Sequence, residues 1–246
     1  MKAIKILYLD PYTNTEVSKR YLYYEGLFNS LKKLCDIYLY RELFLNFNDI
    51  KDKIPFTPDV AIFGLSWLDK HKYYGIIKNL DFPKVCFIFK PQNNLANKFE
   101  FCKNNSIELI LSPNKDYKFY GENIGAHSKL FPYGFDPNIF KPRIQIPKKF
   151  DFGFSGALHN QKHYVDGSFR TKNMRRKIHN KVLKISRLKL FWKSSDVFKT
   201  ARIHNNYEYA KTINSSFIWL ATMAANDDIT PRYFEVMGSC ALLLCE

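Results

Sequence analysis

Short, nearly continuous apolar runs recur along the first half of this chain, and helix-length stretches of mixed character separate them. The runs lie at residues 4–9, 36–40, 59–64, 84–89 and 108–112. Strands buried on both faces have this composition, and alternation with helices is typical of a parallel sheet covered on both sides. We therefore expect a doubly wound α/β sheet that closes near Phe131. A helix is expected over about residues 18–34, where apolar residues recur every three or four positions.

A second α/β alternation follows an irregular stretch from Pro132 to Pro142. Three prolines and Gly134 interrupt that stretch, so it predicts a hinge rather than a packed element. Beyond it the pattern predicts strands at residues 150–156, 187–192, 216–221 and 241–244, and helices at 170–185, 207–213 and 231–237. A chain of 246 residues accommodates two ordinary domains. We expect them at residues 1–142 and 143–246.

The second domain is expected to be incomplete. Its last predicted strand, residues 241–244, is strongly apolar, yet no helix-length segment follows it. Natural folds avoid leaving such a sheet edge open. The pattern therefore predicts a truncated C-terminal domain.

The chain is strongly basic. It carries 38 Lys and Arg against 23 Asp and Glu, a formal net charge of +15. Such an excess attracts nucleic acid, acidic lipid or phosphorylated small molecules. A general compositional bias toward Lys, Asn, Ile, Tyr and Phe would give the same positive charge without selection for binding. The basic helix expected from Arg170 is either a solvated face or a contact with nucleic acid or anionic lipid. Nucleic acid is not favoured, because no recognisable RNA-binding or zinc-finger motif is present.

The cysteines and histidines indicate neither a disulfide framework nor a metal site. The five cysteines form no CxxC pair, and the six histidines show no metal-ligand spacing. No stretch approaches the roughly 18 apolar residues of a membrane span, and the first apolar run is too short for a signal peptide. We therefore expect a cytoplasmic protein, including the case of a protein peripheral at the inner membrane face.

The most informative segment for function is Thr-Pro-Arg-Tyr-Phe-Glu-Val-Met-Gly-Ser-Cys-Ala-Leu-Leu-Leu at residues 230–244. It places Arg232 and Glu235 three residues apart, on one face of the predicted helix. A helix N-terminus and a guanidinium favour phosphate, whereas a carboxylate accepts hydrogen bonds from sugar or ribose hydroxyls. On spacing alone, the alternative is an intrahelical Arg–Glu pair on an ordinary amphipathic helix.

This segment resembles the donor-site helix of group 1 glycosyltransferases, most closely the spore-maturation-protein type with its Pro-Arg-x-Phe-Glu pattern. The resemblance implies a GT-B fold, in which two Rossmann-like domains face a cleft. It implies a nucleotide-sugar donor, a glycan, lipid-linked or protein acceptor, and no metal or other cofactor. The family's ribose-binding glutamate maps onto Glu235. Asp227 stands where the superfamily often has a second acid that contacts the sugar, although that acid is usually glutamate.

Two further segments agree with this family in order along the chain. Phe152–Gly156 resembles the first strand and loop of its nucleotide-binding domain, and places Ser155 and Gly156 in a small-residue turn. Taken alone, such a turn is more often structural than phosphate-binding. Arg170, opening the next predicted helix, stands where the family tends to carry a phosphate-contacting arginine. The resemblance covers about residues 128–246, whereas residues 1–127 agree only in fold pattern.

The sequence does not single out a catalytic base. An inverting enzyme needs an Asp, Glu or His of the first domain near the acceptor hydroxyl. Asp10, Asp69 and His71 lie near predicted strand ends or in the loops beyond them, where each also has a purely structural interpretation. Two other functions remain open, a basic nucleic-acid-binding protein and a non-catalytic interaction module on the same fold.

Overall fold

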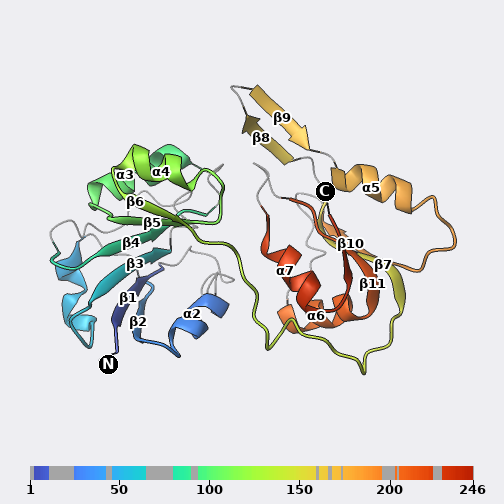
Figure 1. Ribbon diagram of the computed structural model, residues 1–246, viewed down its shortest axis with the longest axis horizontal. Helices are drawn as coiled ribbons and strands as arrows, with labels where there is room; N and C mark the ends of the chain where they lie inside the picture. Colours follow the sequence, from blue (N-terminus) through green and yellow to red (C-terminus); the bar gives the residue numbers. More distant parts are fainter. Residues whose placement is uncertain are drawn as a thin grey trace. The chain divides into compact units, whose positions relative to one another are not determined.

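The computed structural model describes residues 3–10, 25–42, 46–64, 80–89, 94–158, 161–165, 168–172, 174–195, 203, 205–223 and 229–245. The chain forms two compact units, Met1–Pro132 and Tyr133–Glu246 (Figure 1). Both are α/β, and each contains a parallel sheet.

The first unit is built on six described strands. They are β1 (Lys5–Leu9), β2 (Asp36–Tyr40), β3 (Val60–Gly64), β4 (Lys84–Phe87), β5 (Leu109–Ser112) and β6 (His127–Leu130). Their order in the sheet is β2-β1-β3-β4-β5-β6, and every pairing is parallel. The order reverses direction between β1 and β3, which is the point where open α/β sheets bind ligands beyond the strand ends.

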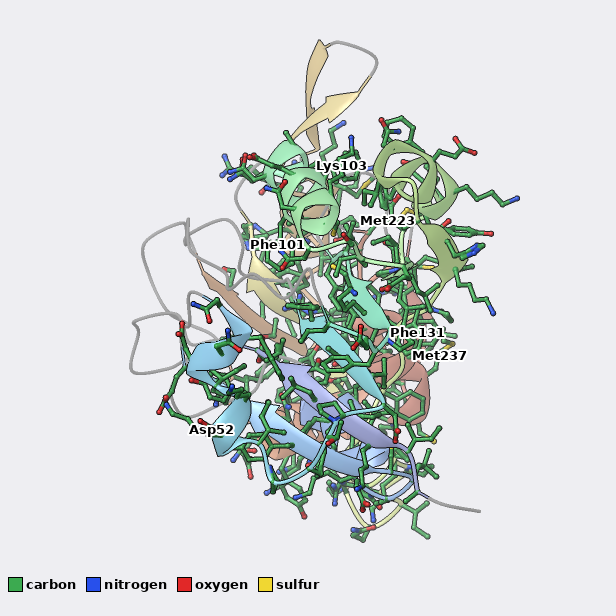
Figure 2. The ribbon with its side chains drawn as sticks, turned by 90° about the vertical axis from the view of Figure 1, so that its left-hand side faces the viewer. Asp52, Phe101, Lys103, Phe131, Met223 and Met237 are labelled. Atoms are coloured by element: carbon green, nitrogen blue, oxygen red, sulfur yellow. The ribbon has the colours of Figure 1, made fainter. Side chains whose placement is uncertain are left out.

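The helices described in this unit are α2 (Glu25–Leu31), α3 (Leu95–Asn104) and α4 (Tyr117–Ile124), with single 3-10 turns η1 (Phe47–Asp49) and η2 (Lys51–Lys53). Helices α3 and α4 lie together, since the rings of Phe99 and Tyr120 are 5.9 Å apart. Phe101 of α3 packs into the core against Phe63 of β3, whereas Lys103 on the same helix is exposed (Figure 2). Apolar strands and the buried faces of these helices thus form one core.

Five strands of this sheet follow the apolar runs of the sequence, and β6 is the exception. β6 lies at the sheet edge and pairs only with β5 among the described strands. Its residues His127, Lys129 and Leu130 are exposed. An edge strand needs no continuous apolar run, so the pattern that predicts buried strands did not identify this one. The expected helix over residues 18–34 is described only from residue 25, as α2.

The second unit repeats the reversal of strand order. Its sheet contains β7 (Phe150–Ala157), β10 (Leu190–Ser195), β11 (Ser216–Leu220) and β12 (Leu242–Leu244), in the order β10-β7-β11-β12. All of these pairings are parallel. The described helices are α5 (Met174–Val182), α6 (Asn206–Asn214) and α7 (Pro231–Gly238).

Both faces of this second sheet are covered, as expected for nearly continuous apolar strands. Phe152 and Phe154 of β7 share a core cluster with Val182 of α5. Trp219 of β11 belongs to the other cluster, with residues of α6 and α7. In Figure 1, α5 accordingly lies on one side of the sheet and α6 and α7 on the other. A side chain at Gly153 would collide with the Trp219 ring, so only glycine fits beneath it.

A β-hairpin occupies part of the segment predicted as a basic helix. β8 (Gln161–Val165) pairs antiparallel with β9 (Ser168–Lys172), and α5 begins only at Met174. The prediction that a helix opens at Arg170 is therefore wrong. The sequence signal for a hairpin that was overlooked is the dipeptide Asp166-Gly167, because Asp-Gly is typical of two-residue hairpin turns.

The segment after Pro132 is not uniformly a hinge. It belongs to the second unit from Tyr133 onward, although the sequence favoured a boundary at residue 142. Phe140 is buried and packs edge-on against Tyr209 of α6 at 6.1 Å. The Arg143 amide donates to Asn214 Oδ1 at 2.8 Å. Side chains of one distant helix, α6, thus fix this stretch, and the prolines and lack of periodicity of the stretch do not reveal these contacts.

Candidate functional site

The candidate site lies at the carboxyl edge of the second sheet, where the strand order reverses between β7 and β11. Helix α7 begins nearby with Pro231 at its first turn, after Thr230 in extended conformation. Proline suits this position, since the first helical amides have no intrahelical acceptor. The sequence prediction of a helix carrying Arg232 and Glu235 on its first turns is confirmed.

Gly156 and Arg232 are in close approach. Gly156 has a φ of +157°, and an added Cβ would lie 2.6 Å from Arg232 Nη1. A glycine here lets the guanidinium of α7 reach the backbone near the end of β7. At the 4.0 Å limit for an ion pair, the described residues show none between Arg232 and Glu235, so the alternative of an intrahelical pair is not realised.

The small-residue turn predicted at Ser155 and Gly156 is instead part of the strand. β7 continues to Ala157, and both residues pair with β10, Ser155 with Lys193 and Gly156 with Ser194. Ser155 is buried. The ladder with β10 therefore carries β7 through these small residues to Ala157, beyond Gly153, the last residue in its register with β11.

A second guanidinium reaches the same edge from α5. Arg175 Nε donates a hydrogen bond to Thr222 Oγ1 at 2.6 Å, and Thr222 lies just beyond the end of β11. Thr222 is buried and Arg175 is partly buried. This contact holds Arg175 beside the point of strand reversal.

Glu235 and Tyr209 complete the group electrostatically. Burial raises the pKa of Glu235 to about 7, and the Arg232 guanidinium opposes the shift. Burial also raises the pKa of Tyr209 to about 12, the Arg232 and Arg175 guanidiniums oppose this, and the Glu235 carboxylate adds to it. The nearby Trp219 indole opposes it as well, although neither the Tyr209 hydroxyl nor that indole N–H forms a hydrogen bond of good geometry.

The Tyr209 phenol is therefore within electrostatic reach of two guanidiniums and one carboxyl group. The guanidiniums offer bidentate donors to phosphate oxygens. The Glu235 carboxylate accepts hydrogen bonds from hydroxyls when it is ionised. Burial withholds water from this carboxylate, which is why its pKa is raised. This set therefore offers donors for phosphate oxygens and an acceptor for hydroxyl groups.

The first unit has a buried acid at the corresponding place. Asp10 directly follows β1, is 5% exposed, and donates its amide to Tyr40 O at 3.1 Å. Burial raises the pKa of its carboxyl group to about 6, and the Arg41 guanidinium opposes the shift. A Cβ at Gly64, the last residue of β3, would lie 3.2 Å from Asp10 Oδ1. A carboxyl group with this pKa is suited to general base chemistry near neutral pH.

The other predicted site residues fall outside this group or outside the described chain. Arg170 pairs with His163 across the β8–β9 hairpin instead of opening a helix. Asp69, His71 and Asp227 lie outside the described residues.

The sequence interpretation overlooked Arg175, Thr222 and Tyr209. Arg175 stands at the second position of the true α5, so a correct helix start at Met174 would have drawn attention to it. Tyr209 and Thr222 carry no motif. They join the site only because α6 packs beside α7 and β11 ends beside β7.

Comparison with models of protein families and with curated proteins finds no match to this chain. Among the described residues, no group of three or more His, Cys, Asp or Glu is placed to hold a metal ion. Within the same ranges, no helix combines the length and apolar character needed to cross a membrane.

Proposed function

We propose that this protein is a GT-B glycosyltransferase that moves a sugar from a nucleoside diphosphate sugar to an acceptor hydroxyl. The observation that carries the proposal is the approach of Arg232 to Gly156 beside Glu235, at the carboxyl edge of the second sheet. Ligands of doubly wound sheets bind at such a reversal of strand order. The resemblance of residues 230–244 to the donor-site helix of group 1 glycosyltransferases supports the same assignment.

The donor site belongs to the second unit in this proposal. Arg232 and Arg175 bind the diphosphate, and Glu235 accepts hydrogen bonds from the ribose hydroxyls. During transfer the bond from the anomeric carbon to the phosphate oxygen breaks, so negative charge grows on the leaving nucleoside diphosphate. Guanidiniums fixed beforehand stabilise that charge more in the transition state than in the ground state.

The transfer also needs a proton acceptor. An acceptor hydroxyl attacks the anomeric carbon and loses its proton as the new glycosidic bond forms. Asp10 is our candidate for this role among the acids that the sequence analysis named, because its pKa of about 6 leaves its carboxyl group largely ionised at neutral pH.

Calorimetry with matched nucleotides tests the donor site. Nucleoside diphosphates with ribose and with 2′-deoxyribose are compared on the native chain and on Glu235→Gln. If Glu235 binds the ribose, the native protein prefers the ribose form, and the variant loses that preference. Arg232→Gln should weaken both forms about equally, at least tenfold, because it removes a charged donor worth about 1.5 to 3 kcal/mol. A ribose preference that survives Glu235→Gln would remove this residue from the site.

Release of nucleoside diphosphate from nucleotide sugars tests the chemistry. Slow hydrolysis of a bound donor without any acceptor, abolished by Arg232→Gln, supports the proposal. Specific binding without release in a panel of donors and acceptors would favour the non-catalytic interaction module. Salt-sensitive binding to generic duplex, without nucleotide binding, would favour the nucleic-acid-binding alternative.

A further inference from the structure

A basic surface on α5 is left unused by the proposed donor site. It consists of the exposed cations Arg176, Lys177, Lys181 and Lys184 together with the exposed apolar residues Leu183 and Ile185. The opposite face of α5 is buried, since Ile178 and Val182 pack in the core beneath it. In Figure 1, α5 lies at the outside of the second unit.

The charge of this surface has no local compensation. The sequence from Gly167 to Ser195 contains ten Lys and Arg and no Asp or Glu. Within the described residues, none of the four exposed cations forms an ion pair at 4.0 Å or less. Lys177, Lys181 and Lys184 follow one another at four and three positions, so they form one stripe along the helix and the turn after it. Among the residues that the structure describes, this surface therefore presents a row of positive charge without a paired acid.

The apolar residues decide between the anionic partners that such a row attracts. Leu183 is 55% exposed and Ile185 42% exposed, on either side of Lys184. Apolar side chains beside lysines gain free energy by entering the boundary between lipid headgroups and acyl chains. A nucleic-acid backbone offers them no comparable apolar environment. Acidic headgroups, in turn, concentrate basic segments at the membrane surface.

We propose that this α5 surface docks the protein on membranes that contain acidic phospholipid, with the lysine stripe contacting headgroup phosphates and Leu183 and Ile185 entering the interface. The docking surface does not include Arg175, whose side chain is engaged with Thr222. Membrane docking and donor binding thus use different residues and are separable by substitution.

Vesicle cosedimentation with the whole chain tests this. The protein is mixed with phosphatidylcholine vesicles with or without phosphatidylglycerol. One variant carries Lys177→Gln, Lys181→Gln and Lys184→Gln together. The control variant carries Lys103→Gln, Lys115→Gln and Lys118→Gln together. All six lysines are exposed, so both variants lose the same charge. Binding that requires phosphatidylglycerol, and that falls at least tenfold in the first variant but less than twofold in the control, supports the proposal.

The double variant Leu183→Ser and Ile185→Ser tests the apolar part. It should weaken vesicle binding severalfold, most clearly at high salt where charge attraction is screened. Glycerol phosphate added in solution should compete poorly if a lipid surface, and not free phosphate, is the ligand. Equal losses in the two lysine variants would overturn the proposal, as would binding to duplex DNA but not to vesicles. Unfolding curves of every variant identify a loss caused by misfolding. Unchanged vesicle binding in a folded variant that lacks the three α5-surface lysines also overturns the proposal.

Discussion

Gly156 of β7 gives the guanidinium of Arg232 its place, because a Cβ at Gly156 would lie 2.6 Å from Arg232 Nη1. One residue belongs to a central strand and the other to the first turn of α7, and the chain between them includes the β8–β9 hairpin and four further elements, α5, β10, α6 and β11. The geometry of the proposed donor site depends on this absence of a side chain. The dependence is directly testable.

We expect Gly156→Ala to displace Arg232 and to raise the dissociation constant for nucleoside diphosphate at least tenfold. The added methyl group cannot share the space of the guanidinium, and the φ of +157° also disfavours alanine. Calorimetry measures the effect. The matched control is Gly134→Ala, where an added Cβ meets no atom within 4 Å. Similar affinity in both variants would show that Arg232 does not need this position to bind the ligand.

The affinity for nucleoside diphosphate should depend on the ionisation of Glu235. With a pKa of about 7, only about a tenth of the carboxyl groups are ionised one unit below it, and hydroxyl binding needs the ionised form. Native affinity should therefore be roughly tenfold weaker at pH 6 than at pH 8. Glu235→Gln removes this group, so the phosphate's own titration alone remains in the variant. Calorimetry at both pH values gives the comparison, and identical pH profiles for the two proteins would exclude Glu235 as the titrating group.

Ionised Asp10 should lower the free energy of unfolding above the pH at which its carboxyl group ionises in the folded state. Its pKa of about 6 exceeds the ordinary 3.8, so the folded state holds the proton more tightly than the unfolded state. Stability therefore falls as pH rises from 3.8 through 6, and below 3.8 the penalty is absent. Asp10→Asn should stabilise the protein at pH 7 by up to about 3 kcal/mol, and this gain should shrink progressively toward pH 4.

Denaturant unfolding at several pH values measures that gain. The control is Asp52→Asn, which makes the same substitution at an exposed position. A constant difference between native protein and Asp10→Asn from pH 4 to pH 7 would contradict the raised pKa of Asp10.

Phe140→Ala should destabilise the second unit strongly. Phe140 is 4% exposed and packs against Tyr209, and removing a buried phenylalanine typically costs about 3 to 5 kcal/mol. Phe217→Ala, at a position 55% exposed on β11 of the same unit, should cost much less. Chemical denaturation followed by tryptophan fluorescence reports mainly on this unit, since two of the three tryptophans, Trp192 and Trp219, lie in it. Equal, small losses would mean that the stretch around Phe140 is a mobile linker after all.

The sequence by itself determined the local elements whose signal is contained in their own residues. Buried parallel strands such as β1 and β11 need continuous apolar runs, and those runs are visible in the sequence. Helix α7 needs only its proline start and its apolar period, and these also fix Arg232 and Glu235 on one face. Two elements carry weak sequence signals. β6 is an exposed edge strand without an apolar run, and the hairpin before Met174 depends on a two-residue turn, so sequence patterns identified neither of them.

The tertiary structure alone decided which side chains meet. Arg175 takes a position at the strand reversal that the sequence interpretation gave to Arg170, because α5 starts later than its basic composition suggests and Thr222 fixes the guanidinium. Phe140 is a second example. Its proline-rich surroundings predicted a hinge, but α6 (residues 206–214) packs against Phe140 and buries it. Contacts between segments far apart in the chain depend on the packing of the whole unit. Composition and periodicity record only the preference of each segment for an apolar or polar environment, and they do not specify its partner.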